Sequence, residues 1–296
     1  MPGRYIGAGA ITRRLGQAGA AGRQSGSCHA RRRTPGHAAG AAPYDGAMQV
    51  HEFAQPFAPE GDERVGVLFL HGFTATPYTL REWATRTAEA GYRVAVPRLP
   101  GHGTSWRELE ITDGRDWYAA AERAFLDLRA VCPVVFVAGL SMGGALALRL
   151  AEQYAADVRG LILVNPALTG NPELALVPLA KHLIRTTDSM GSGINKPDVT
   201  EHTYPRTPLK AVHAMMRLWG DVRARLDLVY CPILLFRSEV DHVVPGSSRE
   251  IVLRQVSSEE ITEVVLSDSD HVAPLDNDAD LIVAGTLDFL AKHDTP

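Results

Sequence analysis

The residues best suited to carry out chemistry lie around Ser141, in a Gly-x-Ser-x-Gly pentapeptide at positions 139–143. An apolar run, Val134–Ala138, precedes it, and a helical pattern from Ala145 to Tyr154 follows. A serine at such a strand-to-helix turn is exposed as a nucleophile, and glycines are needed because side chains would clash in so sharp a turn. The helix start also leaves backbone N–H groups free to face a developing oxyanion. This context favours a nucleophile over an incidental serine in a glycine-rich turn.

A serine nucleophile needs a base to remove its proton, and the base needs an acid to orient it. When a Gly-x-Ser-x-Gly turn carries the nucleophile, the acid and then the base follow it along the chain. Asp241 comes after the apolar run Ile233–Phe236, and His271 comes after the last run, Val264–Leu266. Both residues are therefore expected on loops at the sheet edge that carries Ser141. We predict nucleophile, acid and base in that order.

Other residues near the predicted acid and base are candidates for the same roles. Glu239 is two residues nearer the strand and is a second, less favoured candidate for the acid. His242 is adjacent to the favoured acid and cannot easily turn back to it, so we expect it at the surface or rim. Asp268 and Asp270 lie just before the predicted base, but neither follows the preceding strand in the expected order.

Acyl transfer also requires donors for the oxyanion, each typically contributing about 3–4 kcal/mol to transition-state stabilisation. One donor should be the backbone N–H of Met142, the residue after the nucleophile. The second should come from the loop 71–74, where the backbone N–H of Phe73 is the best candidate and its ring would line the acyl pocket. His71 and His102 flank glycines in tight turns and are interpreted as structural or pocket-lining.

The elements that must position these residues read as alternating strands and helices. Continuous apolar runs separated by helical segments are typical of a parallel sheet covered on both faces. Thr79 and Glu82 have the spacing of a capping box, which predicts a helix that Gly91 ends. The predicted strands are Val65–Leu70, Val94–Val96, Val134–Ala138, Leu161–Val164, Ile233–Phe236 and Val264–Leu266.

The alternation breaks between Asn165 and Val229, an interval too long for a simple loop. Leu209, Val212, Met216, Trp219 and Val222 recur at helical spacing within it. This helix either docks on the core from outside or belongs to an insertion over the carboxyl edge of the sheet, where ligands bind in open α/β folds. The two accounts are compatible. Further apolar residues are expected to dock the segment on the body: Leu174, Leu176, Val177, Leu179, Leu183 and Ile184.

Composition limits the class of protein. The 296 residues carry 30 Lys plus Arg and 34 Asp plus Glu, a net charge of −4, so no basic surplus points to nucleic acid or an anionic membrane. No apolar stretch approaches the 18 residues of a membrane span, which argues against stable membrane insertion. The three cysteines (Cys28, Cys132 and Cys231) form neither a disulfide framework nor a zinc pattern. We expect a cytoplasmic protein without a metal.

Residues 1–47 differ from the rest of the chain. They contain seven arginines and a single acidic residue, Asp45, among many glycines and alanines. Such a segment buries too little apolar surface to offset its ordering entropy, so we predict a disordered leader or an over-called start with Met48 as the initiator. It lacks the apolar core of a secretory signal and only superficially suggests a transit peptide. The folded domain is predicted to span 48–296.

Together these motifs resemble the bacterial carboxylesterase and monoacylglycerol lipase group of the α/β-hydrolase fold. The resemblance covers 48–296 and implies Ser141, Asp241 and His271 as the triad, Phe73 and Met142 as oxyanion donors, and a compact helical cap at about 166–225. The segment before the acid reads RSEVD, where many relatives have a glycine-containing turn. The matching motifs are HGFTATP at 71–77, RLPGHGTSW at 98–106, GLSMGG at 139–144, TPLKA at 207–211, DHVVP at 241–245 and DSDHV at 268–272.

The sequence therefore predicts an enzyme that hydrolyses short- to medium-chain acyl esters or monoacylglycerols through an acyl-enzyme, with no cofactor. Dissolved esters are favoured over bulk lipid as substrates. Hydrolysis of amides, thioesters or carbon–carbon bonds stays open because the same triad serves them all. A non-catalytic binding protein of the same fold is a further alternative, although it would not need all three residues. Acyl length, leaving alcohol and oligomeric state do not follow from the sequence.

Overall fold

The computed structural model describes residues 49–59, 61–189, 191 and 193–295, and its centre is a six-stranded sheet. The strand order is β2-β1-β3-β4-β7-β8 and every neighbouring pair is parallel. This confirms the parallel sheet predicted from the apolar runs, each of which overlaps one of these strands. The strands are β1 (Asp62–Leu70), β2 (Tyr92–Ala95), β3 (Val134–Leu140), β4 (Val158–Val164), β7 (Ile233–Ser238) and β8 (Ile261–Leu266).

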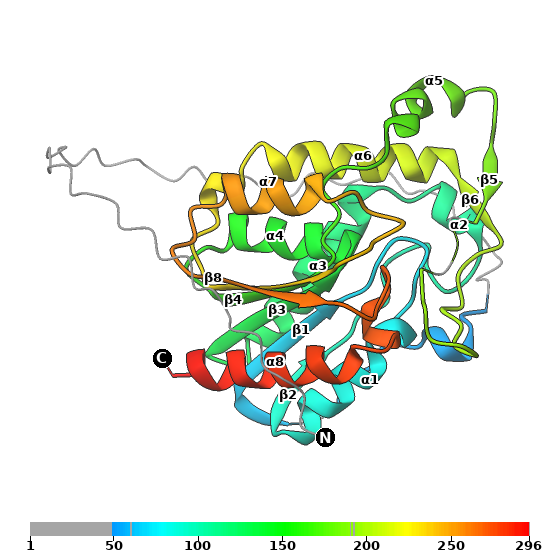
Figure 1. Ribbon diagram of the computed structural model, residues 1–296. Coiled ribbons are helices and arrows are strands. Elements are labelled where there is room, and N and C mark those ends of the chain that lie inside the picture. Colours follow the sequence, from blue (N-terminus) through cyan, green and yellow to red (C-terminus); the bar gives the residue numbers. More distant parts are fainter. Residues whose placement is uncertain (1–48, 60, 190, 192, 296) are drawn as a thin grey trace, which may run out of the picture.

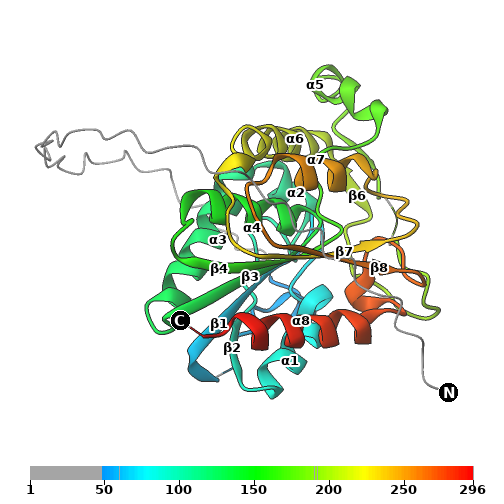
Figure 2. The same cartoon turned by 60° about the vertical axis from the view of Figure 1, so that its left-hand side comes forward.

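Helices cover both faces of the sheet (Figure 1 and Figure 2). Alternate side chains of β3 enter two separate apolar cores: Phe136 and Ala138 join one, and Val135 and Val137 join the other. Burial on both faces explains why the strand is apolar throughout. The first core contains α1 (Tyr78–Glu89) and α8 (Ala279–His293), and the second contains α3 (Gly114–Arg129), α4 (Met142–Gln153), α6 (Leu209–Arg223) and α7 (Ser247–Gln255).

The start of α1 differs from the prediction, whereas its end agrees. Pro77 occupies the N-cap position, and Thr79 lies inside the first turn with a buried hydroxyl that has no hydrogen-bond partner among the described residues. The predicted capping box is therefore wrong, because the helix begins at Tyr78, one residue before Thr79, with Pro77 at its N-cap. The helix ends before Gly91, which adopts φ +102°, a conformation that favours glycine.

The chain between β4 and β7 forms a separate layer above the carboxyl edge of the sheet. Its longest element, α6, packs against α4 while Met215 and Trp219 on it reach the cavity described below. This helix therefore packs on the core and also contributes to the lining of the cavity. Its shorter elements are α5 (Val177–Ala180), β5 (Thr186–Asp188), β6 (Arg206–Pro208) and the 3-10 turns Pro172–Leu176 and Leu226–Leu228. Helix α2 (Trp106–Glu110), from the chain before β3, contacts β6.

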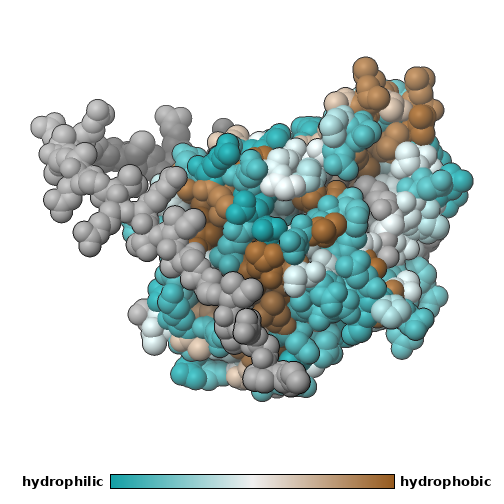
Figure 3. All heavy atoms as spheres, in the orientation of Figure 1, coloured by the Kyte–Doolittle hydropathy of each residue, from teal (hydrophilic) through white to brown (hydrophobic). Residues whose placement is uncertain are grey.

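The apolar side chains around α5 do not dock on the body as expected. Val177 is buried, but Leu179 and Leu183 are 75% and 91% exposed, and Leu176 and Ile184 are more than half exposed. The segment stands away from the sheet in Figure 1, and brown apolar residues cover the same region in Figure 3. The expectation was wrong for these four residues, of which only Leu179 lies within α5, because Val177 is the one side chain of this short helix that is buried.

None of the helices in the described part of the chain is long and apolar enough to cross a membrane. Cys132 is buried, Cys231 is partly buried, and both are free thiols. Cys28 and the predicted leader, 1–47, lie outside the described residues.

Candidate active site

Ser141 lies at a sharp turn between β3 and α4. Its backbone adopts φ 55° and ψ −118°, a strained conformation for a residue with a side chain. The glycine two positions later is needed because a Cβ on Gly143 would lie 1.9 Å from the carbonyl oxygen of Leu70. A Cβ on Gly139 would likewise lie 2.3 Å from the carbonyl oxygen of Gly143. The pattern of glycines thus has a steric cause, and it leaves the serine side chain at the carboxyl end of β3.

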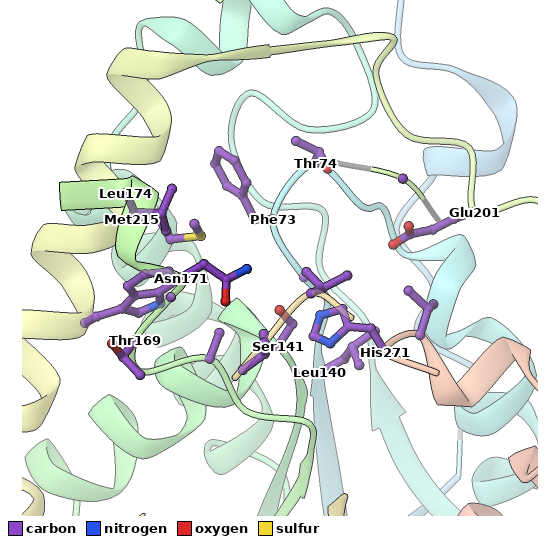
Figure 4. Close-up of a pocket in the computed structure, with 18 of the residues that line it drawn as sticks. Phe73, Thr74, Leu140, Ser141, Thr169, Asn171, Leu174, Glu201, Met215 and His271 are labelled. Atoms are coloured by element: carbon purple, nitrogen blue, oxygen red, sulfur yellow. The ribbon is translucent and has the colours of Figure 1, made fainter. Parts of the chain in front are cut away.

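The loops after β7 and β8 bring Asp241 and His271 into contact. The distance between Nδ1 of His271 and Oδ2 of Asp241 is 2.8 Å. The N–H groups of Val243 and Val244 both donate to Oδ1 of Asp241, which orients the carboxylate toward the ring. Both side chains are nearly buried, with exposed fractions of 7% and 11%. Figure 4 shows the imidazole of His271 beside the side chain of Ser141.

The other candidates for the acid point elsewhere. Glu239 is exposed at the end of β7. Asp270 accepts a hydrogen bond from the backbone N–H of His271 (2.7 Å), and its Oδ2 lies 2.8 Å from Nδ1 of His242. The side chain of His242 is 73% exposed, which agrees with the rim position expected for it. The imidazole of His271 therefore pairs with Asp241 rather than with either alternative.

Backbone N–H groups of two loops are free to stabilise an oxyanion. Met142 is the first residue of α4, and helix geometry leaves its N–H without an intrahelical acceptor. Within the described part of the chain, the N–H of Phe73 also lacks an acceptor. Phe73, Gly72 and Ser141 line the same cavity, and a Cβ on Gly72 would lie 3.4 Å from the Cβ of Ser141. The two loops therefore meet at the serine.

His71 holds the second of these loops in place. Burial lowers the pKa of His71 well below its ordinary value, so the ring is neutral. Its Nδ1 donates to the carbonyl oxygen of Gly72 (2.9 Å), and its Nε2 accepts from the N–H of Leu99 (3.1 Å). His102 packs edge-on against it. Neither histidine lines the cavity, so the structural alternative for both is the correct one.

A cavity of about 190 Å³ opens over the serine, between the sheet edge and the layer that contains α6. Its lining is mixed, and Figure 4 shows Thr169 and Asn171 on the same side of Ser141 as Leu174 and Met215. Leu174, Met215 and Trp219 form an apolar wall, and Glu201 lies on the opposite side of Ser141.

Glu201 is a pocket residue that the sequence analysis missed. It is 7% exposed, and among the described residues no charge or hydrogen bond offsets the desolvation of its carboxyl. Burial raises the pKa of its carboxyl from 4.5 to about 8, so the group is mostly neutral at pH 7. It lies in a stretch without periodic apolar residues or a motif, and no sequence signal would have identified it.

Comparison with known proteins agrees with this architecture. A model of the alpha/beta hydrolase family matches residues 67–284, which is most of the chain. This chain belongs to the alpha/beta hydrolase family. Within the described residues of this hydrolase, no group of three or more His, Cys, Asp or Glu side chains is arranged to hold a metal ion.

Individual relatives of this hydrolase act on esters. A thermostable monoacylglycerol lipase of Bacillus sp. (strain H-257) is 42% identical over 81% of this chain and 95% of its own length. A carboxylesterase of Bacillus subtilis (strain 168) is 26% identical over 81% of this chain and 97% of its own length. A solved structure from a study of the metagenome-derived lipolytic enzymes LipS and LipT has a TM-score of 0.80 and 38% identity, covering 83% of this chain and 100% of the other. The chain is therefore an ester-hydrolysing enzyme.

Proposed function

We propose that this hydrolase cleaves short- to medium-chain acyl esters and monoacylglycerols through an acyl-enzyme on Ser141. The observation that carries the proposal is the 2.8 Å contact of His271 with Asp241 beside Ser141, in the wall of a cavity. Because Nδ1 of His271 is held by Asp241, the ring presents Nε2 as its other nitrogen for the serine hydroxyl.

In the first step, Oγ of Ser141 attacks the ester carbonyl carbon while Nε2 of His271 takes the hydroxyl proton. The carbonyl oxygen becomes an oxyanion, which accepts hydrogen bonds from the backbone N–H groups of Phe73 and Met142. Asp241 stabilises the imidazolium without taking a proton itself. The tetrahedral intermediate then collapses, and His271 gives its proton to the leaving alcohol.

In the second step, water attacks the acyl-enzyme. His271 removes a proton from the water as it adds to the acyl carbon, and the same two N–H groups stabilise the second oxyanion. Collapse releases the carboxylic acid and returns the proton to Oγ of Ser141. Every role in both steps is filled by a group of this chain.

The mixed apolar and polar lining of the cavity supports an amphiphilic ester. Leu174, Met215 and Trp219 offer apolar surface to an acyl chain. Glu201, across from them, is a neutral buried carboxyl that can both donate to and accept from hydroxyl groups of an alcohol such as glycerol. The monoacylglycerol lipase and the carboxylesterase among the relatives favour an oxygen ester over an amide or a thioester.

The test is hydrolysis of p-nitrophenyl esters from acetate to palmitate, compared with monoacylglycerols of the same acyl lengths. We expect activity on both series that Ser141→Ala abolishes, and a loss of about 10⁴-fold in kcat for Asp241→Asn, because the amide holds the wrong imidazole tautomer. A fluorophosphonate should label Ser141.

Two outcomes would contradict the proposal. Absence of labelling in a folded protein would favour the non-catalytic alternative. Labelling with turnover only of matched thioester or anilide substrates would move the function to those bonds.

A further inference from the structure

Two Asp-His dipeptides face each other on neighbouring loops of this enzyme. Asp241 and His242 follow β7, and Asp270 and His271 follow β8, its parallel neighbour in the sheet. The partners are crossed. Asp241 contacts the imidazole of His271 at 2.8 Å, and Asp270 contacts the imidazole of His242 at 2.8 Å.

We propose that Asp270 and His242 form a positioning pair that holds the loop of Asp241 against the loop of His271. This inference rests on the catalytic roles proposed above for Asp241 and His271. It assigns function to two residues that do not touch the substrate and act only through their neighbours.

The carboxylate of Asp270 joins the two loops through both of its oxygens. Its Oδ1 accepts from the backbone N–H of His242 at 3.0 Å and from the backbone N–H of His271 at 2.7 Å. Its Oδ2 binds the ring of His242. One buried group therefore sets the distance between the backbone beside the acid and the backbone of the base.

Asp270 is itself held rigidly at the edge of the sheet. Its N–H donates to Oδ2 of Asp276 (2.9 Å), and its carbonyl oxygen accepts from Oγ of Ser238 (2.7 Å). Asn165, which follows β4, donates to both Ser238 and the carbonyl oxygen of His271. Because only 10% of the Asp270 side chain is exposed, water competes little for its hydrogen bonds.

Charge makes the pair distinguishable from a purely structural contact. Asp270 raises the pKa of His242 by a hydrogen bond and by its charge, so in acid solution the pair is an ion pair with no net charge. The other titratable groups in contact with the pair in the described structure are Asp241, His271 and Asp276, and they are unchanged in the variants below.

The test uses the full chain and measures kcat, KM and Tm on a dissolved p-nitrophenyl ester, with kcat expressed per site titrated by fluorophosphonate. We expect Asp270→Ala to lower kcat about 10- to 100-fold with KM within about twofold, because a displacement near 1 Å at the base has that effect. Asp270→Asn should recover most of this loss at pH 8, since the amide oxygen still accepts both backbone N–H groups. Asp268→Asn is the matched control on the same loop, with an exposed side chain, and should match the wild type.

The pH profile supplies a second readout. His242→Ala leaves the charge of Asp270 uncompensated beside the base, which favours the protonated imidazole and should move the acidic limb of kcat/KM up by about half a pH unit. Asp270→Asn removes that negative charge and should move the limb down by about the same amount. If the two substitutions only disturbed the structure, they would not be expected to move the acidic limb of kcat/KM in opposite directions.

The inference is overturned if Asp270→Ala retains wild-type kcat per titrated site, or if both variants shift the limb in the same direction. Failure of the proposed function has a different signature. The Ser141→Ala variant would then remain active, or the fluorophosphonate would not label the wild type.

Discussion

Ionising a buried carboxyl group costs free energy, and the side chain of Glu201 is buried in the wall of the cavity. Its pKa is raised to about 8 by burial, without a charged partner to offset the desolvation. An acidic residue with this environment is unfavourable for stability near neutral pH, so its presence in the cavity wall agrees with a role in binding hydroxyl groups.

The pH dependence of stability should report this group. Between about pH 5 and 8 the folded state binds a proton at Glu201 that the unfolded chain releases, so its contribution to stability is complete below 4.5 and is lost as the pH rises toward 8. Over that range we expect the free energy of unfolding of the wild type to fall by up to about 1.4 kcal/mol per pH unit more than that of Glu201→Gln. Urea titrations of both proteins measure this, and parallel curves would contradict it.

At the scale of elements, two glycines on neighbouring helices should respond in opposite ways to the same change. Gly143, in the first turn of α4, leaves no room for a Cβ, which would lie 1.9 Å from the carbonyl oxygen of Leu70. Gly220, inside α6, has no atom within 4 Å of a Cβ built on it.

We expect Gly143→Ala to destabilise the fold by about 3 kcal/mol or more through this overlap. Gly220→Ala should instead stabilise the protein by about 0.5–1 kcal/mol, because alanine loses less backbone entropy in a helix. Chemical denaturation of the two variants checks both signs. If Gly143→Ala changed the free energy of unfolding no more unfavourably than Gly220→Ala, the turn at Ser141 would relax more easily than its geometry indicates.

The exposed leucines near α5 should contribute little to folding. Leu179 and Leu183 are 75% and 91% exposed, and replacing both by serine should change the free energy of unfolding by less than about 0.5 kcal/mol while reducing binding of a hydrophobic dye. Val177→Ser, at a buried position of the same helix, is the matched control and should cost about 1–2 kcal/mol. A large loss of stability from the leucine variants would show that they are packed in solution.

In the whole molecule, the sheet order gathers residues that are far apart along the chain. The loops after β1, β3, β7 and β8 carry Phe73, Ser141, Asp241 and His271 in turn. All these strands are parallel, so their carboxyl ends lie at one edge of the sheet, and the α6 layer covers that edge to form the cavity.

A chain that begins at Met48 should keep both fold and activity, because every strand of the main sheet and every residue of the candidate site lies between 62 and 295. We expect its Tm and kcat on a dissolved ester to match those of the full chain within experimental error. Calorimetry and kinetics on both forms provide the comparison. A clear drop in either quantity would assign a role to the first 47 residues.

The local pattern of the sequence was sufficient for much of the architecture. Two-sided burial makes a central parallel strand such as β3 apolar along its length, and the apolar runs overlapped all six strands. At the partly buried edge strand β8 the run covered only its last three residues. The strand-to-helix turn at Ser141 was equally visible, because its backbone tolerates only glycine at the flanking positions. The start of α1 was misplaced because Thr79 and Glu82 have the spacing of a capping box, although Thr79 is already the second residue of a helix whose N-cap is Pro77.

The sequence predicted that the loops of Ser141, Asp241 and His271 share one edge of the sheet, but the individual contacts between distant segments required the tertiary structure. The contacts of Asp241 with His271 and of Asp270 with His242 depend on how two loops cross after parallel strands. The burial of Glu201 and the exposure of Leu183 depend on where the layer between β4 and β7 comes to rest. Periodicity reports whether a side chain faces an apolar or a polar environment within one element. It contains no information on which other element provides that environment, and only packing decides this.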